Sequence, residues 1–91
     1  MERLLNSVGK MCFVEYFEKF KNTNIEHSDL VKTIHEEKGY SLKACQTRVS
    51  KARKIIGNGH TCEALQTIIK ARRVDERTRS RAIQLYEENC N

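Results

Sequence analysis

The chain has 91 residues, enough for one domain with a single modest core but too few for a deep substrate cavity. It lacks proline and its aliphatic residues recur at helical spacing, which favours an all-α architecture over strands. The formal net charge is +5, and residues 43–81 hold eleven of the seventeen Lys and Arg residues but only three of the twelve acidic residues. This basic segment predicts a polyanionic partner. We expect one compact bundle of about five helices over residues 1–91, without a β-ribbon wing.

The N-terminus lacks a hydrophobic run long enough for a signal peptide, and no segment approaches a transmembrane span. We therefore expect a cytoplasmic protein with no membrane partner. The four cysteines include no C-x-x-C pair. We expect free thiols in a reducing compartment, with Cys12, Cys45 and Cys62 on apolar helical stripes and Cys90 exposed at the tail.

The first helix is predicted over about residues 3 to 21, with Gly9 bending it. Its apolar residues are Leu4, Leu5, Val8, Met11, Cys12, Phe13, Tyr16, Phe17 and Phe20. Because they cover more than half of the circumference, the helix needs more than one neighbour. The aromatic residues favour a central core helix, and the alternative is a homodimer formed through this apolar face.

A second helix is predicted to begin near Ser28 and to end at about Lys38, with a left-handed cap at Gly39. Its expected buried face consists of Leu30, Val31 and Ile34. The third helix is predicted over residues 41–56, with Ser41 as the N-cap and Gly57 turning the chain out of the helix at positive φ.

The third predicted helix is amphipathic and strongly basic. Its apolar stripe comprises Leu42, Cys45, Val49, Ala52 and Ile56, and its other side carries Lys43, Gln46, Thr47, Ser50, Arg53 and Lys54. The helix holds five cations and no acid. Arg and Lys mixed with Gln, Thr and Ser bind phosphates and hydrogen-bond to base edges, so we interpret it as a recognition helix. The alternative is a solvated basic surface helix.

The segment over about residues 28–57 resembles the helix-turn-helix unit of small transcription regulators and phage DNA-binding proteins. The resemblance rests on Leu30, Ile34, Gly39, Leu42, Cys45 and Val49, with Gln46, Thr47 and Ser50 facing outward. Three features depart from that family: His35 replaces a small residue, Lys38 replaces an apolar one, and Val49 falls one place late, which implies a longer turn. The resemblance implies transcription regulation or a phage or mobile-element accessory role.

After the Gly57 to His60 loop, Thr61 is expected to cap a fourth helix and Asp75 a fifth. Their predicted buried residues are Cys62, Leu65, Ile68 and Ile69, followed by Ala82, Leu85 and Tyr86. The cations Lys70, Arg72, Arg73, Arg77, Arg79 and Arg81 form a second basic group. One interpretation is that these cations contact flanking phosphates. The alternative is that those at the end of the fourth helix interact favourably with the helix dipole and that the arginines of the fifth pair with acidic residues elsewhere.

We expect no enzymatic activity, no cofactor and no metal site. His27 and His35 lack a paired nucleophile, and the spacing of His60 and Cys62 matches no familiar metal site. The leading hypothesis is sequence-specific or semi-specific double-stranded DNA binding, which would associate this cytoplasmic protein with the nucleoid. In it, Lys43, Gln46, Thr47, Ser50 and Arg53 face the groove, Arg48, Lys51 and Lys54 straddle the backbone, and Arg72, Arg73, Arg77 and Arg81 contact flanking phosphates. The alternatives are docking on an acidic protein partner, or RNA binding, which the few aromatic residues disfavour.

Overall fold

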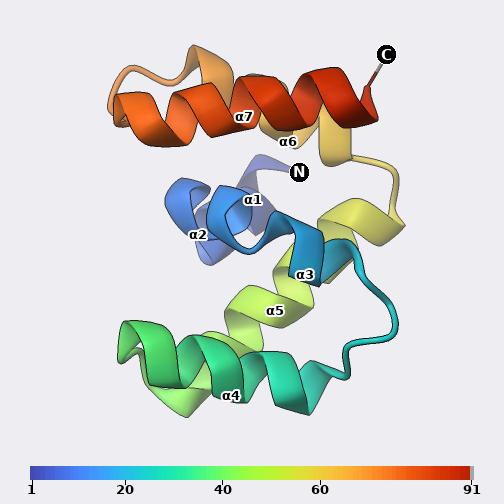
Figure 1. Cartoon of the computed structure of the whole chain (residues 1–91), viewed down its shortest axis with the longest axis vertical. Helices are drawn as coiled ribbons and strands as arrows, with labels where there is room; N and C mark the ends of the chain where they lie inside the picture. Colours follow the sequence, from blue (N-terminus) through green and yellow to red (C-terminus); the bar gives the residue numbers. More distant parts are fainter. Residues whose placement is uncertain (91) are drawn as a thin grey trace.

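The computed structural model describes residues 1–90, and within them the chain forms seven helices and no strand. The helices are α1 (Glu2–Val8), α2 (Lys10–Glu15), α3 (Phe17–Lys21), α4 (His27–Lys38), α5 (Leu42–Gly57), α6 (Thr61–Lys70) and α7 (Glu76–Asn89). In Figure 1, α1 to α3 lie between the α6 and α7 pair at one end and α4 at the other, while α5 runs from α4 to the middle of the bundle. The all-α prediction is confirmed. None of these helices is both long and apolar enough to cross a membrane.

The N-terminal segment consists of three short helices, so the prediction of one helix over residues 3 to 21 was wrong. Gly9 has φ 89°, a backbone conformation open to glycine but rarely to other residues, and it separates α1 from α2. Tyr16, with φ −106° and ψ 15°, separates α2 from α3. The bend expected at Gly9 is a complete break, and the second break carries no local sequence signal.

The aromatic residues of this segment form the centre of the core, as the core-helix interpretation predicted. Phe13, Phe17 and Phe20 are almost fully buried, and the rings of Phe13 and Phe17 meet edge to face with centroids 5.6 Å apart. Most of the apolar face on which the homodimer alternative depended is therefore buried inside the chain itself. Leu4 is only partly buried, and Met11 is 59% exposed.

The helices α4 and α5 pack against each other and are joined by residues 39–41. Two local predictions here are confirmed: Gly39 is left-handed with φ 73°, and the Ser41 hydroxyl accepts a hydrogen bond from the Ala44 amide at 3.1 Å. The helix α4 begins at His27, next to the predicted start near Ser28, and Glu26 occupies the N-cap position. The buried residues Leu30, Val31 and Ile34 are those predicted.

The two ends of α5 differ from prediction. Leu42, the first residue of α5, was expected on the apolar stripe but is 53% exposed. At the other end Ile55 is fully buried and Ile56 only partly. Gly57 belongs to the helix, and the positive φ of the following loop falls on Gly59 at 78°.

The C-terminal helices α6 and α7 pack as a pair. Asp75 caps α7 as predicted, accepting a hydrogen bond from the Thr78 amide at 3.1 Å. Thr61 is the first residue of α6 and His60 occupies the N-cap position, so the predicted Thr61 cap was wrong. Leu65, Ile68, Ala82 and Leu85 are buried as predicted, while Cys62, Ile69 and Tyr86 are only partly buried.

A disulfide joins Cys62 at the start of α6 to Cys90 just after α7, with Cα atoms 5.8 Å apart. The expectation of four free thiols was therefore wrong for this pair, because pairing α6 with α7 brings together cysteines that are 28 residues apart. Cys12 and Cys45 are free and buried, as predicted.

We expect reduction of the disulfide to lower the free energy of unfolding by about 3–4 kcal/mol, because the cross-link restricts the unfolded chain over a separation of 28 residues. The measurement is urea denaturation of the protein with and without dithiothreitol. Cys62→Ser/Cys90→Ser is the control: its stability should equal that of the reduced protein and should not respond to the reductant. Identical curves for oxidised and reduced protein would contradict the prediction.

Candidate functional site

The outer face of α5 carries five exposed residues with neighbouring positions on the helix: Lys43, Gln46, Thr47, Ser50 and Lys54. We call this set the α5 strip. The opposite face of the helix is anchored in the core by Cys45, Val49, Ala52 and Ile55, all fully buried. The core therefore fixes which side chains point outward, and no acidic residue occurs anywhere on α5.

Most side chains of the α5 strip are available to a ligand. The Thr47 hydroxyl donates to the Lys43 carbonyl at 3.2 Å, which leaves its oxygen free to accept. Within residues 1–90, the side chains of Lys43, Gln46, Ser50 and Lys54 make no hydrogen bond or ion pair. Lys51, also predicted to contact DNA, is half-buried at the edge of the strip.

Arg48 points into the bundle. One of its Nη atoms donates to the Val8 carbonyl, the last of α1, at 2.5 Å, and its guanidinium carbon lies 4.1 Å from the centre of the Tyr40 ring. A cation at a helix C-terminus satisfies free carbonyls and is favoured by the dipole. Arg48 thus fastens the end of α1 to α5.

Arg53 makes the same kind of contact with the end of α3. Its Nε donates to the Phe20 carbonyl at 3.2 Å, and one Nη donates to the Ile25 carbonyl at 2.7 Å and the Asn22 carbonyl at 3.1 Å. These carbonyls belong to the end of α3 and the loop that leads to α4. Both arginines were predicted to contact DNA, but the structure directs them to backbone carbonyls rather than to the α5 strip.

The C-terminal cations lie in three different environments. Arg79 donates to the carbonyls of Ile69 and Val74, so it closes the end of α6. Lys70, Arg72 and Arg73 are exposed at the end of α6 and in the loop after it. Arg77 and Arg81 line a cavity together with residues of α2 and the end of α4, and no residue of α5 lines that cavity. The structure therefore does not bring Arg77 and Arg81 together with the α5 strip.

The free thiols lack the character of nucleophiles. Burial raises the pKa of Cys12, against the opposing effect of the nearby Arg48 guanidinium, and burial likewise raises the pKa of Cys45. Both therefore stay protonated at neutral pH. Within the described part of the chain, no group of three or more His, Cys, Asp or Glu side chains is arranged to hold a metal ion.

Comparison of the chain with protein families, with curated proteins and with solved structures gave no match. The site is therefore interpreted from its own geometry. The protein is a small helical bundle in which one helix, α5, is basic and contains no acidic residue.

Proposed function

We propose that this protein binds double-stranded DNA through the α5 strip. The observation that carries the proposal is the strip itself: two exposed lysines with an amide and two hydroxyl groups between them, on a helix without acids and with its other face held in the core. Lysines bind phosphates, and the Gln46 amide has the two-pronged geometry that recognises adenine in the major groove.

The neighbourhood of α5 supports this proposal. A short turn with a left-handed glycine joins α4 to α5, and the two helices pack against each other. This order resembles a helix-turn-helix unit, in which the second helix enters the major groove. On this basis we further propose that the protein is a transcription regulator or an accessory factor of a phage or mobile element.

We expect Gln46→Ala and Lys54→Ala to affect DNA binding differently. Gln46→Ala removes a base contact, so it should reduce the preference for a selected site by about 1–3 kcal/mol and leave the salt dependence unchanged. Lys54→Ala removes a phosphate contact, so it should weaken binding to all duplexes equally and reduce the slope of log K against log salt by about one. The measurement is fluorescence anisotropy with duplex DNA at several salt concentrations.

The matched control is Lys32→Ala. Lys32 is an exposed lysine of α4 that lies between the buried residues Val31 and Ile34 in sequence and projects from the side of α4 opposite to them. Its removal changes the net charge as Lys54→Ala does, but should leave the salt slope unchanged. Absence of duplex binding at low salt would reject the proposal, and equal effects of Lys32→Ala and Lys54→Ala would reject the α5 strip as its site.

A further inference from the structure

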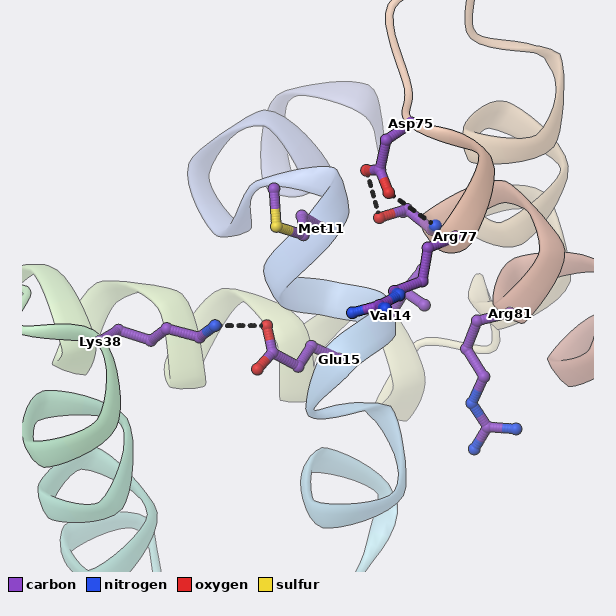
Figure 2. Close-up of a pocket in the computed structure, with 8 residues that line it drawn as sticks. Met11, Val14, Glu15, Lys38, Asp75, Arg77 and Arg81 are labelled. Carbon is purple, nitrogen blue, oxygen red and sulfur yellow. Dashed lines mark hydrogen bonds and ion pairs between the residues drawn. The ribbon is translucent and has the colours of Figure 1, made fainter.

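A second surface feature is a cavity of about 530 Å³ between α2, the start of α7 and the end of α4. Figure 2 shows Arg77 and Arg81 projecting from α7, the Lys38 and Glu15 pair on the other side, and Met11 and Val14 on α2. The volume falls in the range of about 300–1,000 Å³ typical of ligand sites.

The floor of this cavity is apolar. Met11 is the most exposed large hydrophobic residue among residues 1–90, at 59%, and Val14 lies beside it, buried in the core. Methionine is flexible and adapts to irregular apolar partners, which makes it common at binding surfaces. An exposed methionine in a concave site is consistent with burial by a partner.

The two carboxylates of the cavity are already engaged within the chain. Glu15 forms an ion pair with Lys38 at 2.7 Å. Asp75 accepts hydrogen bonds from the Thr78 amide and, at 2.6 Å, from the Thr78 hydroxyl, and both bonds hold its pKa below the usual value. These contacts hold the Glu15 and Asp75 side chains in place along the sides of the cavity.

The arginines of the cavity have weaker contacts, although the charge of Arg77 also helps to lower the pKa of Asp75. Within residues 1–90, neither Arg77 nor Arg81 forms a hydrogen bond or an ion pair. A smaller cavity of about 230 Å³ shares Met11, Asp75 and Thr78 with the first and adds Lys10 and Arg73. The two cavities therefore adjoin. Together they have an apolar floor and more cationic than acidic side chains along the rim. We call the pair of cavities the α2/α7 groove.

We infer that the α2/α7 groove binds an acidic segment of a partner protein that carries an aliphatic side chain. Asp or Glu side chains of the partner would pair with Arg77 and Arg81, and the aliphatic side chain would cover Met11. Charge complementarity supports this occupant. Duplex DNA fits less well, because its phosphates gain nothing from an apolar floor and are repelled by Glu15 and Asp75. The inference does not depend on DNA binding, since the groove and the α5 strip share no residue.

The test is selection from a random peptide library displayed on phage, with the full chain immobilised. We expect the selected peptides to combine Asp or Glu with Leu, Ile or Phe. Synthetic copies of these peptides should bind Arg77→Ala/Arg81→Ala about tenfold more weakly than the unmodified chain. Met11→Ser, which keeps both arginines, should also weaken binding. The control Lys54→Ala, on the α5 strip, should bind the peptides as the unmodified chain does.

Two results would overturn the inference. The first is that the selected peptides contain no acidic residues, or that their affinity is unchanged in Arg77→Ala/Arg81→Ala and also unchanged in Met11→Ser. The other is a loss of duplex DNA affinity in Arg77→Ala/Arg81→Ala as large as that in Lys54→Ala, which would assign the arginines to nucleic acid. Circular dichroism of each variant checks that the helical fold is retained.

Discussion

Replacing Arg53 by alanine is expected to lower the free energy of unfolding by about 3–4 kcal/mol. The substitution leaves the carbonyls of Phe20 and Ile25 without their partly buried, charged donor, and each such bond contributes about 1.5–3 kcal/mol. The bonds to the more exposed carbonyls of Lys19 and Asn22 add little. The measurement is urea denaturation followed by circular dichroism.

Two further variants test whether Arg53 stabilises the fold through the geometry of its hydrogen bonds or through its positive charge. Lys54→Ala removes a cation from the next position, where the side chain has no partner within residues 1–90, and should change stability by less than about 0.5 kcal/mol. Arg53→Lys keeps the charge but loses the planar fork, so it should recover less than half of the loss. If Arg53→Lys matched the unmodified protein, the charge alone would explain the effect and the carbonyl contacts would not.

Phe13→Ala is expected to lower the free energy of unfolding by about 3–5 kcal/mol. Phe13 is completely buried, and its ring packs against those of Phe17 and Phe20, so truncation removes apolar contacts and leaves a cavity. Because small domains are stable by about 5–15 kcal/mol in total, the variant should be close to unfolding at moderate temperature. Thermal and urea denaturation measure the change.

The control for Phe13→Ala is Met11→Ala in the same short helix. Met11 is largely exposed, so its truncation should change stability by less than about 0.5 kcal/mol. Similar losses for the two variants would contradict the prediction, because they would show that the buried Phe13 side chain contributes no more to stability than the exposed Met11 side chain.

Local signals in the sequence predicted several features that depend on neighbouring residues, although the Thr61 cap and the positive φ at Gly57 were wrong. Gly39 and Asp75 were identified because a left-handed cap and an N-cap each require particular residue types at one position. The buried residues of α4 followed from helical periodicity in the same way. The break at Tyr16 was missed, because no proline or glycine marks it.

Contacts between distant residues could not be predicted from the sequence. Arg53 was placed on the polar side of an amphipathic helix, where periodicity predicts solvent or a ligand. Arg48 lies three residues after the buried Cys45, so helical spacing could have indicated that it points inward. The carbonyls that the two arginines reach, 40 and 33 residues away in the chain, had no signal in the sequence. The cysteine spacing likewise did not reveal the Cys62 and Cys90 pair, which depends on how α6 and α7 pack. Of the predicted α5 residues, Lys43, Gln46, Thr47, Ser50 and Lys54 are exposed, and their role in DNA binding stays a prediction.

The break between α1 and α2 is fixed by a residue from another part of the chain. A Cβ atom at Gly9 would lie 3.0 Å from an Nη atom of Arg48, the side chain that also holds the Val8 carbonyl. Any other residue at position 9 is thus disfavoured for two reasons. The backbone there has a positive φ, and a Cβ atom would come close to the Arg48 guanidinium of α5. The break at Gly9 is therefore held both by the local backbone conformation and by the packing of α1 against α5, so the shape of the N-terminal segment depends on a helix that is distant from it in sequence.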